Sequence, residues 1–271
     1  MKQIFIVAML LVGMTSFAQK TYALIIGVAE HQNPQNNLTW TVNDANKFSE
    51  FIMSSEGGSV PSKNIYLLTN SKATKANIIQ YGKELFSKAK ENDRVIFFFS
   101  GHGAPGAFVP YDASDWNSLL SFADLKEIFR AASCKIKLCF ADACHAGSLK
   151  VDKREMKIAQ LKQTKAEKAR AKNNRKNNTD EVEVAIMLSC MPEEVSLESP
   201  KKKQGYFSYY LIEGLKQYAD LNGDKKITIQ ELHKYVYKKV SDAVKTEIPG
   251  YTQRPMTFGK FDVNMVVSRL Q

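Results

Sequence analysis

The hydrophobic pattern of this chain alternates between two periods. Largely apolar runs of strand length occupy residues 22–28, 64–69, 94–99, 135–140 and 182–190, and the first of them is continuous. Apolar residues recur at helical spacing over residues 42–52, 75–90, 122–131, 206–218 and 229–244. A last strand is expected at residues 254–258, where it could close the sheet. Strands that alternate with helices in this way predict an α/β domain built on a parallel sheet.

The first eighteen residues form a separate segment. Lys2 supplies a positive charge, residues 4–12 are apolar, and residues 16–18 are a small-residue cleavage site before Gln19. This arrangement is typical of a secretory signal peptide, and its apolar run is shorter than the roughly 20 residues that cross a bilayer. We therefore predict a signal peptide at 1–18 and an exported protein, periplasmic or extracellular, with one domain at 19–271 and no membrane span.

Two of the strands end in small and polar residues, and these ends carry the candidate chemistry. The run at 94–99 leads into Ser-Gly-His-Gly, which places His102 just past a strand end, and the run at 135–140 leads in the same way to Cys144. Carboxyl ends of parallel strands meet at the edge of the sheet where ligands bind. A thiol needs a nearby base to react as thiolate, so the pattern predicts a Cys/His dyad. A cysteine taken alone is more often a small buried core residue.

The remaining three cysteines call for a different interpretation. Cys139 lies inside an apolar run and Cys190 ends another, so both are interpreted as packing residues. A chain of 271 residues buries a core large enough to fold without disulfides, even in an oxidising compartment. The sequence leaves the state of Cys134 open.

The net charge of +10 is concentrated in one tract. Residues 150–176 hold eleven Lys or Arg and three acidic residues, with few large apolar side chains. A nucleic-acid-binding fold would spread its charge over the folded surface, so we expect no nucleic-acid partner. The tract at 150–181 is interpreted as a solvated linker or helix between two strands of one domain. The oligomeric state is not indicated.

Seven motifs together point to a family. They are ALIIGV (23–28), VNDA (42–45), FFFSGHG (97–103), FVPYDA (108–113), DACHAG (142–147), YFSYYLIEGL (206–215) and DLNGDKKITIQEL (220–232). This set resembles the caspase-like fold, and within it the bacterial metacaspase-like (orthocaspase) peptidases, over residues 20–259. The resemblance implies a three-layer α-β-α fold with a central, mostly parallel sheet of about six strands. It also implies a large-subunit-like part at 19–149, a basic linker at 150–181 and a small-subunit-like part at 182–271.

The same resemblance assigns roles to individual residues. His102 would be the general base and Cys144 the nucleophile, and the order of His before Cys separates this chain from papain-like enzymes. Backbone N–H groups near Gly103 and Cys144 would hold the oxyanion.

A basic-residue pocket is the second implication of the resemblance. The pocket for the substrate residue before the cleaved bond (S1) would be lined by Asp44, Ser100 and Asp142. Two carboxylates in a cleft select Lys or Arg, whose charge would otherwise be unpaired there. Asp44 alone could equally be a helix cap, a role that is less expected for Asp142 beside the nucleophile.

Calcium is a separate question, because the dyad chemistry needs no cofactor. Many metacaspases hold calcium in the segment after the catalytic His, but residues 103–118 contain only Asp112 and Asp115 as acids. Residues 220–231 match the spacing of an EF-hand loop, although Lys225 stands where Gly is favoured. A helix-turn-helix with polar caps and no metal is the slightly preferred interpretation. The calcium ligands in the alternative would be Asp220, Asn222, Asp224, Lys226, Thr228 and Glu231.

Two functions from different classes are compatible with these residues. The first is a cysteine endopeptidase that cleaves proteins or peptides after Arg or Lys and processes itself in the basic linker. The second is a catalytically silent caspase-like module that binds proteins. Retention of both dyad residues and of the acidic pair favours the enzyme. Self-cleavage would leave one piece with the dyad and one that starts near Glu181, whereas a passive linker would be nicked only by other proteases.

Overall fold

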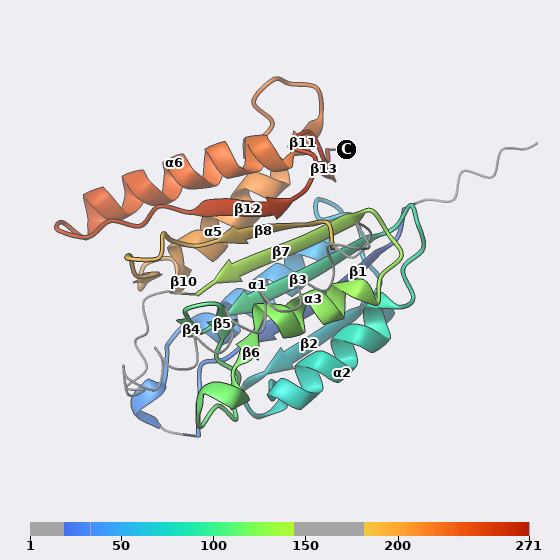
Figure 1. Cartoon of the computed structure of the whole chain (residues 1–271). Coiled ribbons are helices and arrows are strands. Elements are labelled where there is room, and N and C mark those ends of the chain that lie inside the picture. Colours follow the sequence, from blue (N-terminus) through green and yellow to red (C-terminus); the bar gives the residue numbers. More distant parts are fainter. Residues whose placement is uncertain (1–18, 33, 144–181, 271) are drawn as a thin grey trace, which may run out of the picture.

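A six-stranded sheet forms the centre of the protein (Figure 1). The structure is a computed structural model that describes residues 19–32, 34–143 and 182–270. The strand order is β12-β8-β7-β3-β1-β2, and neighbours pair in parallel except β12, which runs antiparallel to β8. This confirms the expected mostly parallel sheet. The strands are β1 (Thr21–Gly27), β2 (Ile65–Thr69), β3 (Arg94–Ser100), β7 (Ile136–Asp142), β8 (Val184–Leu188) and β12 (Met256–Lys260).

Helices cover both faces of the sheet, which gives the three layers of the predicted fold (Figure 1). One layer packs α2 and α3 against the sheet, and the other packs α1, α5 and α6. The helices are α1 (Thr41–Met53), α2 (Lys75–Phe86), α3 (Phe122–Arg130), α5 (Tyr206–Glu213), which continues into the π-helical turn η5 (Gly214–Tyr218), and α6 (Ile229–Glu247). Short 3-10 turns are η1 (Pro34–Asn36), η2 (Ser62–Asn64), η3 (Asn70–Lys72) and η4 (Trp116–Ser118).

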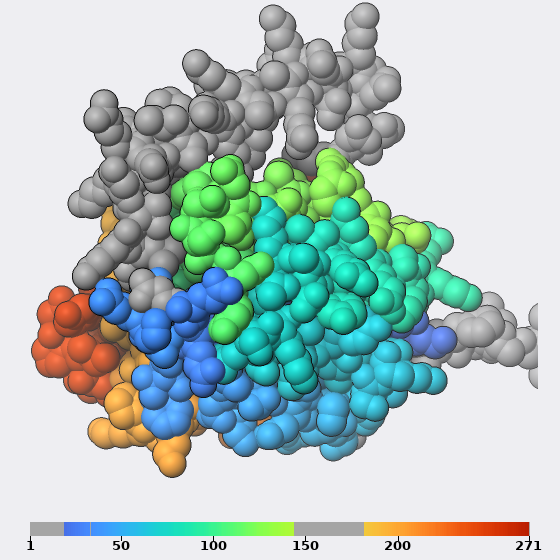
Figure 2. Space-filling view, turned by 90° about the horizontal axis from the view of Figure 1, so that it is seen from below, coloured from blue at the N-terminus to red at the C-terminus, as the bar shows by residue number. Residues whose placement is uncertain are grey.

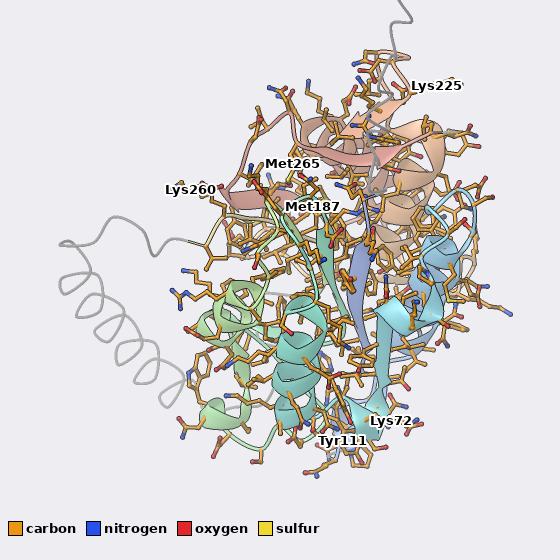
Figure 3. The ribbon with its side chains drawn as sticks, turned by 90° about the vertical axis from the view of Figure 1, so that its right-hand side faces the viewer. Lys72, Tyr111, Met187, Lys225, Lys260 and Met265 are labelled. Atoms are coloured by element: carbon orange, nitrogen blue, oxygen red, sulfur yellow. The ribbon has the colours of Figure 1, made fainter. Side chains whose placement is uncertain are left out.

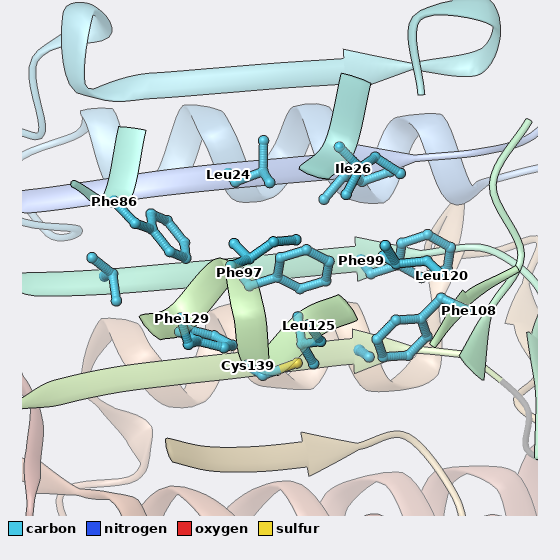
Figure 4. Packing of buried hydrophobic residues seen from close by; sticks show 14 of the residues in the cluster. Leu24, Ile26, Phe86, Phe97, Phe99, Phe108, Leu120, Leu125, Phe129 and Cys139 are labelled. Carbon is cyan, nitrogen blue, oxygen red and sulfur yellow. The ribbon is translucent and has the colours of Figure 1, made fainter. Parts of the chain in front are cut away.

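Strand β3 shows how the continuous apolar runs arise. Successive side chains of a strand point to opposite faces, so a strand covered on both sides must be apolar throughout. Phe97 and Phe99 belong to the cluster under α2 and α3, whereas Phe98 belongs to the cluster under α1 and α6. Phe97 stacks on Phe108, and Figure 4 shows this aromatic layer continuing to Phe129 beside the strands. The central strand is therefore fixed in register by large side chains on both faces.

Polar side chains begin three of the helices in the described part of the chain. Thr74 accepts a hydrogen bond from the backbone N–H of Asn77 at the start of α2. Capping boxes begin α3 at Ser121 and α6 at Thr228. These caps satisfy backbone donors that a helix leaves free in its first turn.

Helix α2 is shorter than the pattern predicts: it ends at Phe86, whereas the pattern predicts a helix up to residue 90. Phe86 is its last fully buried residue, and the polar residues that follow it turn the chain into β3.

Three small antiparallel sheets were not predicted from the sequence. They are β4 (Gly103–Ala104), β5 (Ala107–Phe108) and β6 (Leu120–Ser121); β9 (Glu198–Ser199) with β10 (Gln204–Gly205); and β11 (Lys226–Thr228) with β13 (Val266–Arg269). Their strands have two to four residues, which is too short for a periodic pattern to show.

The amino and carboxyl edges of the parallel strands carry different features. Lys225, in the loop before β11, lies at one end of the molecule, and Lys72 and Tyr111 lie at the opposite end (Figure 3). Arg94, the first residue of β3, donates a hydrogen bond to the Val267 carbonyl of β13, so the EF-hand-like loop belongs to the amino-terminal edge of the parallel strands. His102 follows the opposite, carboxyl end of β3.

Figure 2 shows a face formed mostly by residues 19–143, with residues of the C-terminal part along one side. In the described part of the chain, no helix combines the length and apolar character that a membrane crossing requires.

Candidate active site

The candidate site begins where β3 and β7 end side by side. In the register of these strands Ser100 pairs with Asp142, and the backbone N–H of Gly101 donates to the Asp142 carbonyl over 3.1 Å. His102 and Cys144 each follow this matched pair by two positions in the sequence. Because β3 and β7 are paired in register, they end side by side. This supports the prediction that the segments after the two strands leave the sheet at the same edge.

His102 is held by the loop after β1. Its Nε2 lies 2.7 Å from the Asn36 carbonyl oxygen, and because a carbonyl only accepts, Nε2 carries the proton of the neutral ring. Nδ1 is then the basic nitrogen. Burial lowers the pKa of His102 from its ordinary value, while the Asn36 hydrogen bond and the negative charge of Glu198 act in the opposite direction. The ring is thus kept in the neutral form that a general base requires.

Beside His102 lies a cavity of about 200 Å³ that contains three carboxylates. Asp44, in the first turn of α1, is 1% exposed. Its Oδ2 accepts from the Ser100 hydroxyl over 2.8 Å and its Oδ1 from the Gly205 backbone N–H over 3.0 Å. It is therefore not a cap of its own helix. The lining residues are Leu38, Thr41, Asp44, Ser100, Gly101, His102, Asp142, Val195, Ser196, Leu197, Glu198 and Gly205.

Asp142 has both of the roles that the sequence set against each other. It lines the cavity, and its Oδ2 accepts from the backbone N–H (3.0 Å) and the hydroxyl (2.7 Å) of Ser208 in the first turn of α5. The low expectation of a capping role was therefore wrong, because α5 begins next to the end of β7. The Ser196 hydroxyl donates to the other carboxylate oxygen.

Burial raises the pKa of Asp44 well above its ordinary value, and the neighbouring Asp142 raises it further. Burial also raises the pKa of Asp142, against its hydrogen bonds from Ser196 and Ser208. Two buried carboxyls of like charge resist ionising together. A cation in this cavity would remove that resistance.

Glu198 is the third carboxylate, and the sequence reasoning missed it. It lies on β9, and its oxygens accept from the backbone N–H groups of Trp40 (2.7 Å) and Thr39 (3.3 Å) just before α1. Its charge raises the pKa of Asp44, Asp142 and His102. The rule that ligands bind beyond strand carboxyl ends, applied to β8 as well, would have pointed to this segment.

Cys144 itself lies outside the described residues. The residue before it, Ala143, is held by Ser189 at the end of β8: its N–H donates to the Ser189 hydroxyl (3.1 Å), and that hydroxyl lies 3.2 Å from the Ala143 carbonyl oxygen. Gly103 follows His102 directly as the first residue of β4. The roles of Cys144 and Gly103 stay predictions, as does the basic tract at 150–176.

The other cysteines are buried in the core, as expected for Cys139 and Cys190. Cys134 and Cys139 are free thiols, and burial raises the pKa of both. A raised pKa disfavours the thiolate, so neither resembles a nucleophile.

The EF-hand-like loop uses its acidic side chains to hold its own backbone. Asp220 accepts from the N–H groups of Gly223 and Lys225, and Glu231 accepts from the N–H and hydroxyl of Thr228 as the cap of α6. Among residues 19–32, 34–143 and 182–270, no group of three His, Cys, Asp or Glu side chains is arranged to hold a metal. The side chains as placed do not fit a calcium site.

Comparison with known proteins agrees with this geometry. The family model "Caspase domain" matches residues 20–261. A probable protease of a Desulfuromonadales bacterium is 32% identical over 149 residues, which is 46% of this chain and 18% of that protein. Metacaspase-1A of Aspergillus oryzae is 33% identical over 99 residues, 34% of this chain and 23% of that protein. The chain thus spans less than a quarter of these curated relatives.

Solved structures show the same fold. Caspase-1 from Spodoptera frugiperda superposes with a TM-score of 0.64 at 16% identity, covering 93% of this chain and 91% of that one. A protein from Geobacter sulfurreducens superposes with a TM-score of 0.60 at 17% identity, covering 93% and 100% of the two chains. The match over residues 20–261 shows that this chain belongs to the caspase domain family of cysteine peptidases.

Proposed function

We propose that this protein is a cysteine endopeptidase that cleaves proteins or peptides after Arg or Lys, with Cys144 as nucleophile and His102 as base. The observation that carries the proposal is the cavity in which His102 lies together with Asp44, Asp142 and Glu198. A general base next to an anionic pocket suits the cleavage of a bond that follows a cationic residue.

In the proposed reaction the Cys144 thiol gives its proton to His102 Nδ1 and its sulfur attacks the scissile carbonyl carbon. Backbone N–H groups near Gly103 and Cys144 hold the oxyanion that forms. The imidazolium then gives its proton to the departing amine as the C–N bond breaks, which leaves a thioester. Water, deprotonated by the same nitrogen, hydrolyses the thioester and restores the thiol.

The pocket supplies the specificity in this proposal. The raised pKa values of Asp44 and Asp142 mean that the empty cavity resists holding two full negative charges. The positive charge of an Arg or Lys side chain would remove the repulsion between the two carboxylates. Hydrogen bonds from Ser100 and Gly205 hold the Asp44 carboxylate in place to bind that side chain. A neutral or acidic side chain leaves the carboxylates unpaired, so such substrates are rejected.

The reaction itself requires no cofactor. The side chains of the EF-hand-like loop do not fit calcium as they are placed. The loop lies with β11 and β13 at the start of β3, whereas His102 follows the end of that strand. No step of the proposed mechanism involves a metal.

A panel of fluorogenic peptides that differ only in the residue before the cleaved bond tests the proposal. The wild type should cleave after Arg and Lys and not after Asp. Cys144→Ala should abolish turnover, and His102→Ala should lower it at least about 100-fold, the usual scale for a general base. Circular dichroism verifies that each variant is folded. Unchanged turnover in either folded variant rules out the dyad, and no turnover in the wild type favours a silent binding module.

Self-processing in the basic tract extends the proposal. Residues 150–176 begin six positions after Cys144 and contain eleven Lys or Arg. A tethered segment reaches an effective concentration in the millimolar range, so weak sites can be cut within the chain. Wild type and Cys144→Ala, expressed and purified in parallel, should differ in intact mass, with cleavage inside 150–176 in the wild type alone. Equal nicking of both proteins would assign the cut to another protease.

A further inference from the structure

A second imidazole packs against the candidate base. The ring centroids of His31 and His102 lie 5.2 Å apart, with the planes tilted by 39°. The loop after β1 that carries His31 also supplies the Asn36 carbonyl that holds His102 Nε2. The Asn37 side chain accepts from the His31 backbone N–H over 2.9 Å, which closes this loop on itself. One loop therefore contacts His102 in two ways.

The chemistry of His31 is unusual for a packing residue. It is 7% exposed, and its buried Nε2 has no hydrogen-bond partner among the residues that the structure describes. An unpaired polar atom in the interior destabilises the folded state, whereas a phenyl ring of similar shape would fill the space without that cost. Packing alone thus does not account for a histidine here. The unpaired nitrogen lies in the ring that neighbours His102.

We propose that His31 is a positioning residue for His102. Its neutral ring excludes water from one side of His102, and its unprotonated Nε2 stabilises His102 when that ring takes up a proton during the reaction. A buried lone pair without a donor costs less than a buried N–H without an acceptor, so the proton of neutral His31 belongs on Nδ1. The inference rests on the proposed function, because it takes His102 as the base.

Electrostatics keep His31 in the required state. Burial, and then the charge of His102, lower the pKa of His31 to about 4. His31 therefore stays neutral near neutral pH, and the pair of rings binds one proton before a second. Among the described residues, the charged group acting directly on His102 is Glu198, and Asp44 and Asp142 line the same cavity. Replacing His31 removes none of these three carboxylates, so a change in the His102 pKa can be attributed to His31.

Two substitutions separate the two parts of the proposal. His31→Phe keeps a ring and removes the lone pair, so the pKa of His102 should fall and the acid limb of kcat/KM should move to lower pH. Turnover should drop by about threefold or more, while the melting temperature stays equal or rises because the unpaired nitrogen is gone. His31→Ala admits water, so the His102 pKa and the acid limb should move to higher pH. His31→Gln, which restores an acceptor, should recover part of the turnover lost in His31→Phe.

The measurements are kcat/KM against pH on an Arg-terminated peptide and NMR titration of the His102 ring proton in the full chain. If His31→Phe matches wild type in the pH profile, turnover and His102 pKa, the lone pair has no role and the inference is overturned. If His31→Ala leaves the His102 pKa unchanged, the shielding part is overturned. The NMR titration does not depend on turnover. A wild type without peptidase activity therefore refutes the proposed function, while the titration still decides the inference.

Discussion

Replacing Asp44 with Asn removes one charge from the pocket and keeps its shape. The Asn carbonyl can accept from the Gly205 N–H, now 3.0 Å from Oδ1, and the Asn amide can donate to the Ser100 hydroxyl, now 2.8 Å from Oδ2. A change in specificity can then be attributed to charge and not to a rearranged cavity.

The expected loss follows from the burial of this group. Asp44 is 1% exposed, so a substrate cation that pairs with it is largely desolvated. Removing one partner of such a pair costs about 2–5 kcal/mol, which corresponds to a loss of about 30-fold to about 4,000-fold in kcat/KM. The assay compares two peptides that differ only in Arg or its neutral isostere citrulline before the cleaved bond. Asp44→Asn should lose the preference for Arg, and an unchanged Arg-to-citrulline ratio would refute the charge argument.

The same variant makes a prediction about stability with a defined sign. The pKa of Asp44 in the folded protein is raised above its ordinary value of 3.8. At pH values between the ordinary pKa and the raised pKa, the folded state binds more protons than the unfolded state. The wild type therefore loses stability as the pH rises through this range. Asn does not titrate. The melting temperature of Asp44→Asn should therefore decline less from pH 4 to pH 8 and exceed that of the wild type at neutral pH, and equal slopes would contradict the raised pKa.

Two further substitutions test other parts of the site, and calcium addition tests the EF-hand-like loop. Glu198→Gln removes a charge that raises the His102 pKa, so the acid limb of kcat/KM should move to lower pH; a limb that stays in place would show that Glu198 does not act on the base. Gly205→Ala would put a Cβ 2.1 Å from Asp142 Oδ2, so it should lower stability by about 1–3 kcal/mol in urea unfolding and weaken hydrolysis after Arg; wild-type stability would mean that the strand moves freely. Millimolar calcium should leave the melting temperature unchanged, and a rise that Glu231→Gln removes would restore the EF-hand interpretation.

The long elements follow from the sequence for physical reasons, and part of the pocket follows from the motifs of the resembled family. A strand covered on both faces must be apolar throughout, and β3 shows this as an unbroken run from Val95 to Phe99. Asp44, Ser100 and Asp142 were identified from motifs, and the structure places all three around one cavity.

Glu198 and His31 could not be found in the same way. Glu198 reaches the pocket through β9, which has two residues and no period to recognise. The importance of His31 rests on contact with a ring 71 positions later in the chain, which no local pattern encodes.

The pocket takes its walls from both sides of residues 144–181. Asp44 and Ser100 come from the first part of the chain, whereas Glu198, the Gly205 N–H that fixes Asp44 and the Ser208 groups that fix Asp142 come from the last part. During synthesis, the candidate nucleophile and base therefore leave the ribosome before their binding site exists. A nascent or truncated chain that stops before β8 carries both candidate dyad residues without a complete pocket. Under the proposed function, completion of the fold is in this way a condition for recognising a substrate.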